Sequence, residues 1–596
     1  MSKRKASRIL ETVGKKCARD WNEWVGASKT RNFALGDTLV DYLEKTNESF
    51  SSRAKPSSFG DFATDIMRAG NEFESIIIER IRERFPGYVV TISDSPQSQS
   101  MHHFEKTLDA MRAGAKIIFQ GVLHDTSNLT YGCPDLIVRS DILNKMTAIP
   151  SIEDAEAKRK APLLVEGNYH YRIVDIKYST LHLAADATHI LKQGSVPAYK
   201  TQLAIYNSAL GFLQGYQPGQ AYILGKKWTS KKGTQQFGCS TWNDRFGVVD
   251  YDGRDSQYYE IANEAVMWIL NLRKNYTKWS LSPPSIPELY PNMCCTMSGK
   301  WMQKKYEIAT ELKDISIVWM CGKKNKDAAS KLGITRWDDP RCNSKALGFN
   351  QKTRTSFIVD EILETNRGHQ KIRPEKIRTN IYNWKEENKL DFYVDFETVS
   401  DIFDASKEVT DQDKPIITMI GVGWINPDDG LWKFSCFVGD DMTRESEKVL
   451  SDRFFSYVKR IQERYDSGTS RMIHWSKAEQ FQLESVTNLD EKDTNLVWLD
   501  LLDVFKEEPI TVKGAFNFGL KSIAKAMKSH GMIDTIWEAE NPCADGLSAM
   551  LYSWREYSLR KEGVKSSELM RDISKYNEVD VKTLYEIITF LRTNHI

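Results

Sequence analysis

The chain has 596 residues, of which 41% are hydrophobic and 27% charged, and its net charge at pH 7 is +1. This length suits three or four domains with cores of their own, and no apolar run approaches the ~20 residues that a membrane helix needs. No signal-peptide pattern follows Met1, and the nine cysteines, an odd number without a C-x-x-C pair, indicate reduced thiols. We therefore expect a soluble, intracellular protein without a membrane partner, in the cytoplasm or the nucleus.

The small net charge hides an uneven distribution along the sequence. Residues 1–30 carry eight Lys and Arg against three Asp and Glu, and residues 300–385 carry 19 against 10. Basic segments interleaved with Trp and Tyr suit a polyanion such as nucleic acid. Surface lysines that only keep the protein in solution are an equally good explanation, so charge alone does not identify the partner.

The order of the predicted elements indicates two α/β parts. Residues 1–60 form a basic N-terminal segment and linker, and residues 61–284 form the first α/β part. There we predict helices over 61–84, 184–212 and 255–275, strands over 89–92, 116–123, 171–179 and 220–224, and a turn within 132–138 that leads into a further strand. The polar segment 145–168 is predicted to be a surface insertion, and the stretch from Lys226 to Lys232 a basic loop.

Residues 285–385 are basic and indicate a helical connector broken by Gly333, Pro340 and Gly348. The stretch 328–334, with Trp337 just after it, resembles helix-hairpin-helix elements, in which turn amides and helix N-termini face phosphates. A plain helical connector without a binding role is the alternative.

Residues 386–596 form the second α/β part. The strand pattern covers 391–396, 416–425, 431–438 and 471–475. Helical patterns cover 444–464, 476–488, 519–529 and 571–593, so the chain is expected to end on a long helix.

The strand predicted over 171–179 carries Asp175 and Lys177, which point to the same face because they lie two residues apart. Burying an acid and a base in an apolar strand is costly unless they serve each other or a metal. A salt bridge on an edge strand is the simpler explanation. However, Asp135 follows Pro134 on a neighbouring predicted strand, and two carboxylates so placed can hold Mg²⁺.

Further residues complete a pattern around this strand. Glu74 lies four residues after Gly70 on the preceding helix, and Gln202 and Tyr206 share a helix face downstream. This set resembles the PD-(D/E)xK nucleases, in particular their RecB/lambda-exonuclease branch. The resemblance implies a restriction-endonuclease-like domain over 61–284, with Glu74, Asp135 and Asp175 as metal ligands and Lys177 as the catalytic lysine beside Asp135 and Asp175. Gln202 and Tyr206 would contact DNA.

Many members of this branch hold an iron–sulfur cluster on four cysteines. Cys17 and the pair Cys294–Cys295 invite that comparison. Adjacent cysteines without a C-x2-C spacing are poor cluster ligands, so no iron–sulfur cluster is expected.

A second group of acids lies in residues 393–580. Asp395 and Glu397 share one face of an apolar strand, where two like charges repel each other unless a cation lies between them. Tyr576 and Asp580 are four residues apart on the last helix and share a face. Between them, Glu479 follows a short strand, and Asp500 precedes a Leu-Leu pair.

This arrangement resembles the DEDD exonucleases, which have a ribonuclease H-like fold and use two divalent metals. Asp395 and Glu397 match the first motif, and Tyr576 and Asp580 match the third. The resemblance implies Asp395, Glu397, Glu479 and Asp580 as metal ligands and Tyr576 as a catalytic residue that positions water. Glu479 stands where the family has Asp, and Asp500 could replace it or support the other ligands.

The two resemblances imply a Mg²⁺-dependent (or Mn²⁺-dependent) nuclease, like the RecB-type proteins fused to DEDD domains in prokaryotes and large DNA viruses. We expect a DNA exonuclease that acts in DNA replication, recombination or repair. The replication compartment of a virus is a further possible location. An RNA-directed exonuclease that uses the C-terminal site is one alternative. A non-catalytic DNA-binding subunit of a helicase–nuclease assembly is the other, and because no Walker A pattern occurs, unwinding would need a separate helicase.

Overall fold

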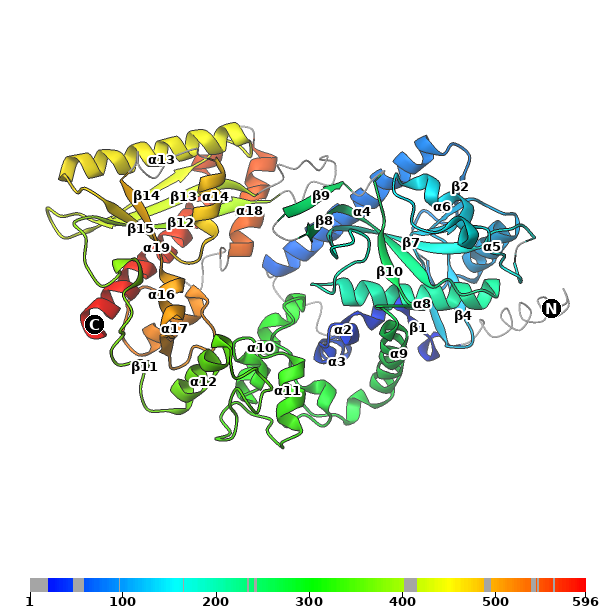
Figure 1. Cartoon of the computed structure of the whole chain (residues 1–596), viewed down its shortest axis with the longest axis horizontal. Coiled ribbons are helices and arrows are strands. Elements are labelled where there is room, and N and C mark those ends of the chain that lie inside the picture. Colours follow the sequence, from blue (N-terminus) through cyan, green and yellow to red (C-terminus); the bar gives the residue numbers. More distant parts are fainter. Residues whose placement is uncertain are drawn as a thin grey trace. The chain divides into compact units, whose positions relative to one another are not determined.

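The computed structural model describes residues 20–46, 58–95, 97–164, 166–232, 235–240, 244–400, 415–486, 495–537, 543, 546–560 and 563–596. Contacts within the chain divide it into two compact units, one holding residues 64–290 with the described residues before 54, the other residues 291–400 with the described residues from 415 (Figure 1). Both units combine helices with a mixed sheet. No helix in the described part of the chain is long and apolar enough to cross a membrane.

The first unit is built on a seven-stranded sheet with the order β10-β8-β7-β6-β3-β2, and β9 pairs with β8 beside it. A second, three-stranded sheet has the order β1-β5-β4. The strands are β1 (Val25–Gly26), β2 (Val89–Thr91), β3 (Ile117–Phe119), β4 (Leu123–Asp125), β5 (Thr130–Gly132), β6 (Leu136–Arg139), β7 (Tyr171–Leu183), β8 (Gln220–Lys232), β9 (Gln235–Ser240) and β10 (Gly247–Asp250). The helices are α2 (Arg31–Ala34), α3 (Thr38–Thr46), α4 (Ser58–Arg84), α5 (Met101–Arg112), α6 (Ser140–Met146), α7 (Asp154–Ala157), α8 (Val196–Gln214) and α9 (Gln257–Asn275).

Strand β7 lies inside the large sheet, parallel to β8 and antiparallel to β6. Its residues Val174 and Ile176 pack in one core with α4 and α6. Asp175 and Lys177 therefore point to the opposite face, where Tyr199 of α8 lies 5.6 Å from the Lys177 ammonium. A central strand thus carries both charged residues, which excludes the simpler alternative of a salt bridge on an edge strand.

Several predicted elements in this unit are confirmed, and two have wrong boundaries. The helices over 61–84 and 255–275 and the strand over 89–92 are present. The strand predicted over 116–123 is split between two sheets, because Gln120 adopts a left-handed φ of 53° and breaks it. The helix predicted from 184 begins only at Val196, where Pro197 fits the first turn.

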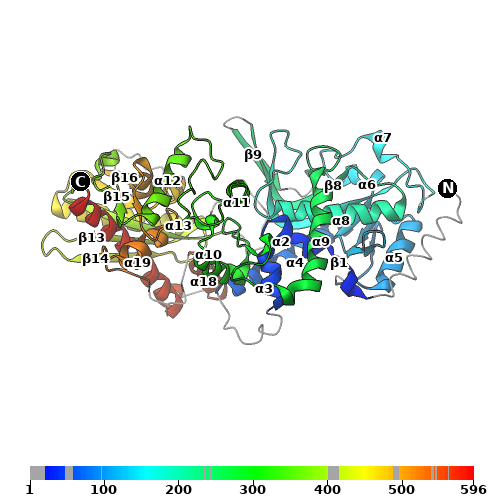
Figure 2. The ribbon, with the colours of Figure 1, turned by 90° about the horizontal axis from the view of Figure 1, so that it is seen from below.

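The basic loop predicted at 226–232 is also wrong, because this stretch belongs to β8. It pairs antiparallel with β9 from Lys227 opposite Ser240 to Lys232 opposite Gln235, and Figure 2 shows the two strands as a hairpin. Trp228 and Ser230 are buried while Lys231 is exposed. The alternation of a strand was present in the sequence, but the four lysines concealed it.

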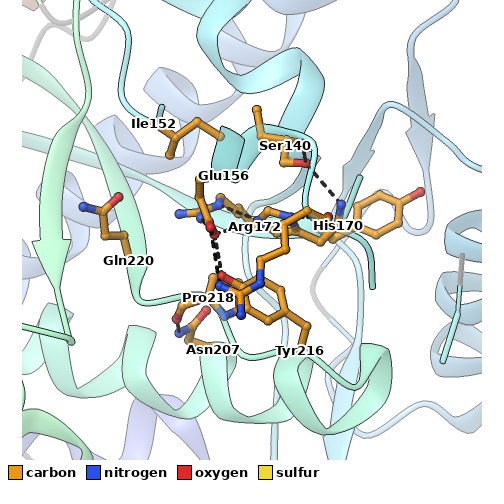
Figure 3. A network of polar contacts seen from close by, with 12 residues as sticks. Ser140, Ile152, Glu156, His170, Arg172, Asn207, Tyr216, Pro218 and Gln220 are labelled. Atoms are coloured by element: carbon orange, nitrogen blue, oxygen red, sulfur yellow. Dashed lines mark hydrogen bonds and ion pairs between the residues drawn. The ribbon is translucent and has the colours of Figure 1, made fainter. Parts of the chain in front are cut away.

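The segment 145–168 is exposed along most of its length, as the prediction of a surface insertion implies, but it is also anchored in the core. Its residues Ile152, Ala157, Ala161 and Leu164 are buried, and Glu156 accepts a hydrogen bond from Arg172, at the start of β7 (Figure 3). A segment that supplies a carboxylate to a buried arginine is part of the core structure of the unit.

Arg172 is fully engaged in this network. Its Nε donates to Nε2 of His170 at 2.8 Å and its Nη1 donates to the Tyr222 hydroxyl at 2.8 Å, while Tyr216 also donates to Glu156 (Figure 3). Burial, followed by the charge of Arg172, lowers the pKa of His170 to about 4, so the neutral ring can accept from Arg172. Glu156 is thus the carboxylate that balances Arg172 in this network.

The second unit is built on a five-stranded sheet with the order β14-β13-β12-β15-β16 and a small sheet in which β11 pairs with β17. The strands are β11 (Ile372–Arg373), β12 (Asp391–Val399), β13 (Ile416–Ile425), β14 (Trp432–Val438), β15 (Ser470–His474), β16 (Leu496–Asp500) and β17 (Thr511–Val512). The helices are α10 (Met302–Glu311), α11 (Lys323–Ser330), α12 (Arg354–Arg367), α13 (Arg444–Tyr465), α14 (Ala478–Val486), α16 (Leu501–Glu507), α17 (Leu520–Ser529), α18 (Gly546–Leu559) and α19 (Glu568–Asn594). The strands and helices predicted for residues 386–596 are present, whereas β16, α16, β17 and α18 were not predicted.

Strand β12 is the middle of the five-stranded sheet, antiparallel to β13 and parallel to β15. Phe392, Val394 and Phe396 face a core that includes residues of α13. Tyr393, on the other face, belongs to a core with residues of α19, and both views show α19 (red) alongside β13 (Figures 1 and 2). Asp395 and Glu397 share the face of Tyr393, so they point toward α19.

From Pro291 on, the basic segment 285–385 is an integral part of the second unit rather than a separate connector. Ile358, Ile362 and Leu363 of α12 share one buried core with Leu584 and Ile588 of α19. Gly333 has a left-handed φ of 71° and ends the turn after α11. The next α-helix along the chain, α12, begins only at Arg354, so the resemblance of 328–334 to a helix-hairpin-helix is not matched by a second helix directly after the turn.

The network around Arg172 can be tested through local stability. The Arg172 side chain is 2% exposed, and removing the partner of a buried charge costs about 3 kcal/mol. We expect Glu156→Ala to lower the free energy of opening of residues 140–174 by about this amount, measured by amide hydrogen exchange. Glu153→Ala, an exposed neighbour, is the matched control and should change it by less than ~0.5 kcal/mol. Equal protection in both variants would contradict the role of Glu156.

Candidate functional site

The first group of predicted site residues gathers around β7. Asp175 is 1% exposed, and the Lys177 ammonium lies 2.6 Å from its Oδ2. That oxygen is buried and makes no hydrogen bond of good geometry. Burial opposes the charge on Lys177, but the negative charges of Asp175 and Asp135 outweigh it and raise its pKa. Lys177 is therefore a protonated cation beside a buried carboxylate.

Asp135 stands beside Asp175, because it directly precedes the β6 residue that pairs with Val174 of β7. Its Oδ2 accepts a hydrogen bond of 2.6 Å from the backbone amide of Ile176. Burial and then the negative charge of Asp175 raise the pKa of Asp135 well above its usual value. The two strands thus bring these two acids together as the sequence predicted.

Glu74 approaches the pair from α4. Its pKa is raised by burial, and a hydrogen bond of 2.5 Å from the Gln120 amide and the charge of Lys177 act in the opposite direction. Gln120 is a residue that sequence analysis missed. Only the left-handed backbone conformation of Gln120 distinguishes it from its neighbours, and the sequence does not show that conformation.

Gln202 and Tyr206 lie on α8 beside the acids. The Gln202 amide donates to the Tyr206 hydroxyl at 2.7 Å, and burial, followed by the charge of Asp175, raises the pKa of Tyr206. A Cβ added to Gly132 would lie 2.1 Å from the Tyr206 ring, so this position needs glycine. All six predicted residues of the first group therefore lie around one site.

The second group is centred on β12 and α19. Carboxylate oxygens of Asp395, Glu397 and Asp580 all lie within 4.8 Å of one another, and in the part of the chain that the structure describes they are the one such group of three or more potential metal ligands. Glu74, Asp135 and Asp175 thus do not converge as closely. The acids of the second group are the better fit to a metal, because hard divalent cations prefer several carboxylate oxygens.

The pKa values of all three acids are raised in this site. Burial, followed by the charges of Asp580 and Glu397, raises the pKa of Asp395 well above its usual value. Burial and the charge of Asp580 raise the pKa of Glu397 to about 8, and burial raises that of Asp580 to about 6. Without a cation, the three acids therefore retain protons at a pH where ordinary carboxyl groups have lost them.

Three neighbours that sequence analysis did not assign hold these acids in place. The Asn577 amide donates to Asp395 at Oδ2 (2.8 Å) and at the backbone carbonyl (3.1 Å). The Trp537 indole donates to Asp580 at 3.1 Å, and the positive charge of Lys521 lowers the pKa of all three acids. Asn577 directly follows Tyr576, but nothing local in the sequence marks Trp537.

Tyr576 lies next to the acids, as predicted. Its hydroxyl is hydrogen-bonded to Asp580, and burial, followed by the charges of Asp580 and Glu397, raises its pKa. The Lys521 ammonium lies 4.5 Å from the centre of its ring. Tyr576 therefore keeps its proton at neutral pH and can donate a hydrogen bond but cannot act as a base.

Glu479 and Asp500 stand further out. Glu479 is outside the group of three, with its Oε2 3.4 Å from Nδ1 of His474, but its charge raises the pKa of Asp395 and Glu397. Asp500 is the N-cap of α16, where its carboxylate accepts hydrogen bonds from the amides of Leu502 and Ser476. Asp500 thus supports the turn before Glu479 and is not itself among the converging acids.

The cysteines give no second metal group among the described residues. Cys294 is exposed and its thiol donates to the carbonyl of Cys321 at 3.0 Å. Cys17 lies outside the described residues.

The chain matches no protein-family model, no curated protein and no solved structure. The chemistry of the two sites is therefore the basis for a proposal of function.

The acids of β12 predict an unusual dependence of stability on pH. Because the pKa of Glu397 is higher in the folded chain, at about 8, than when unfolded, folding takes up a proton and stability falls as the pH rises from about 5 to 8. Glu397→Gln carries no such penalty, so in EDTA at pH 8 we expect its Tm to exceed that of the wild type by at least ~3 °C. Mg²⁺ or Mn²⁺ should raise the Tm of the wild type and not of Glu397→Gln, measured by differential scanning calorimetry.

Glu387→Gln, which removes an exposed carboxylate from the same region, is the control and should follow the wild type in both tests. If Glu397→Gln also follows the wild type, the group of three acids does not bind a cation.

Asn577 offers a test of how the acids are held. Partners that orient metal ligands typically contribute 10–100-fold in metal affinity, so we expect Asn577→Ala to weaken Mn²⁺ binding by about 10–100-fold in isothermal titration calorimetry. Asn594→Ala lies at the exposed end of the same helix and should bind Mn²⁺ as the wild type does. An unchanged affinity in Asn577→Ala would show that Asp395 needs no support from α19.

Proposed function

We propose that this protein is a Mg²⁺-dependent nuclease whose principal catalytic site is formed by Asp395, Glu397 and Asp580. The observation that carries the proposal is the convergence of these three carboxylates within 4.8 Å, with Glu397 and Asp580 buried and Asp395 partly exposed. The position of the acids on a central strand and on the last helix also agrees with the resemblance to DEDD exonucleases and their ribonuclease H-like fold.

The residues of the site have distinct tasks in this proposal. When bound, divalent cations would neutralise the three carboxylates, polarise a water and stabilise the leaving oxygen of a phosphodiester. Asn577 keeps the Asp395 carboxylate oriented. Tyr576, whose proton is donated to Asp580, offers its hydroxyl oxygen as an acceptor that would orient the attacking water. Lys521 places a positive charge beside the acids, where a phosphate oxygen of the substrate would lie.

The site on β7 would be a second nuclease centre of the PD-(D/E)xK type. Its support is the contact of Asp135 with Asp175 and the protonated Lys177 beside them. Asp135 and Asp175 would share one cation with Glu74, and Lys177 would face the phosphate. Gln202 and Tyr206, which are joined by a hydrogen bond, would border the bound DNA strand.

DNA is the substrate that the resemblance to the RecB/lambda-exonuclease branch favours, in the context of replication, recombination or repair. RNA remains the alternative substrate of the C-terminal site. A non-catalytic DNA-binding subunit that works with a helicase is the alternative without chemistry.

One set of variants separates these proposals. We expect Asp395→Asn to reduce Mg²⁺-dependent hydrolysis of labelled DNA by at least ~100-fold, because it removes an acid from the converging group while keeping its size. Asp175→Asn should remove a smaller, separable part of the activity. Single- and double-stranded DNA and RNA are compared as substrates on denaturing gels. Asp391, on the same strand as Asp395, is unsuitable as a control because it is ion-paired with Arg471.

Asp429→Asn removes an exposed acid that lies outside the site and is the matched control. If RNA is cut best and only Asp395→Asn is inactive, the RNA-directed alternative is correct. Tight DNA binding without hydrolysis in either Mg²⁺ or Mn²⁺ would establish the non-catalytic subunit instead.

A further inference from the structure

A pocket of about 720 Å³ lies within the second unit, formed by Lys313, Trp337, Asp338, Glu364, Arg367 and Arg373 together with short backbone stretches. This volume is in the range that holds a nucleotide-sized ligand. All of these residues belong to the basic segment 300–385, and none of them takes part in the two acidic sites.

Trp337 supplies an aromatic wall of this pocket. Its ring packs on Phe516, with 4.8 Å between the ring centres and an angle of 59°, and its backbone amide donates to the carbonyl of Lys313 at 2.9 Å. The indole Nε1 is buried and makes no hydrogen bond, so packing fixes the ring in place. Trp337 remains partly exposed, and an aromatic surface of this kind is a platform on which a base can stack.

Three cations, Lys313, Arg367 and Arg373, line the same pocket as Trp337, and the Lys313 ammonium lies 5.7 Å from the centre of its ring. The Lys313 ammonium lies 2.7 Å from Asp338, and the Arg373 guanidinium lies 2.9 Å from Glu364. Lys313 is 42% and Arg373 30% exposed, and such exposed ion pairs are weak, at about 0–1 kcal/mol. Arg373 also lies 3.4 Å from Glu361, so a phosphate would compete with Asp338 for Lys313 and with Glu361 and Glu364 for Arg373.

Arg367 is held differently. Its Nη1 donates to the carbonyls of Asp339 (2.8 Å) and Cys342 (2.9 Å), so the guanidinium is fixed by the backbone and keeps its positive charge without a carboxylate partner in these contacts. The pocket thus offers a rigid cation, two exchangeable cations and an aromatic ring.

We infer that this pocket binds one nucleotide of a single-stranded nucleic acid, with the base against Trp337 and the phosphate near Arg373 and Lys313. A base and a phosphate in one ligand are what this combination of groups recognises. The inference deepens the proposed nuclease function, since it assigns a binding site to the substrate strand, but the pocket is made of residues outside both metal sites.

Binding can be measured separately from hydrolysis. We expect the full chain in EDTA to bind a fluorescein-labelled dT12 strand, followed by fluorescence anisotropy, and Trp337→Leu to weaken binding by at least ~10-fold. Trp337→Phe, which keeps an aromatic ring and is the safer change for folding, should weaken binding about 3-fold. Arg373→Gln should lower the slope of log affinity against log salt by about 0.7.

Arg378→Gln removes an exposed cation from the same basic segment outside the pocket and is the matched control. Its affinity should lie within 2-fold of that of the unaltered protein. A labelled rU12 strand and unlabelled dTMP as a competitor distinguish a DNA strand, an RNA strand and a free nucleotide as the source of the ligand. If Trp337→Phe and Arg373→Gln bind dT12 and rU12 as Arg378→Gln does, the inference is wrong.

The outcome is independent of the nuclease proposal. If the pocket variants lose binding and Asp395→Asn still hydrolyses DNA as the unaltered protein does, the assignment of the pocket is correct and that of the catalytic site is wrong. If the pocket variants bind normally and Asp395→Asn no longer hydrolyses DNA, the assignment of the pocket is wrong and that of the catalytic site is correct.

Discussion

Mutual repulsion among Asp395, Glu397 and Asp580 is the constraint on which the second unit depends. Three carboxylates with oxygens within 4.8 Å in a buried site are stable only if protons, hydrogen-bond donors or cations offset their charges. The raised pKa values of all three acids show that proton uptake supplies part of this balance. The fold supplies another part through Asn577 and Lys521, and the remainder is what a divalent cation would provide.

Much of this site could be predicted from local spacing. Two residues two apart in a strand share a face, which placed Asp395 with Glu397, and two residues four apart in a helix share a face, which placed Tyr576 with Asp580. Spacing does not say which helix packs on which face of a sheet. The contact of α19 with β12 comes from the apolar residues of the core, including Tyr393 and Val581, and so Trp537, which reaches Asp580 from a distant loop, could not be found.

The fold was predicted best where apolar periodicity was regular and worst where long polar side chains interrupt it. The hairpin of β8 and β9 was missed because Lys226 and Lys227 disguise a strand in which Trp228 is buried. The anchoring of the segment 145–168 was missed because the ion pair between Glu156 and the buried Arg172 looks polar in the sequence. In both cases the burial of a polar or charged group depends on a partner far along the chain, which local composition does not reveal.

The two acidic centres differ in how their charge is balanced. At β7 the sequence places Lys177 on the same strand face as Asp175, and the resulting contact of 2.6 Å offsets part of the charge of that acid from within. At β12 the acids lie closer to one another, while Lys521 comes from a separate helix and lies against the Tyr576 ring. At the first centre no acid departs from the family motif, whereas Glu479 departs from it at the second. The geometry nevertheless favours the second centre, because convergence of oxygens, and not the identity of the motif, determines how well a cation is held.

The basic segment 300–385 belongs to the same unit as the second centre, so its pocket and the acids are parts of one packed structure. Ile372 of β11 pairs with Val512 of β17, and the chain continues from β17 into α17, which carries Lys521. The wall of the pocket that contains Arg373 is therefore linked through one small sheet to the helix that supplies a cation to the acids. A shared hydrophobic core that includes α12 and α19 makes these elements one packed body, so a strand held at Trp337 would be held by the same unit that carries the acids.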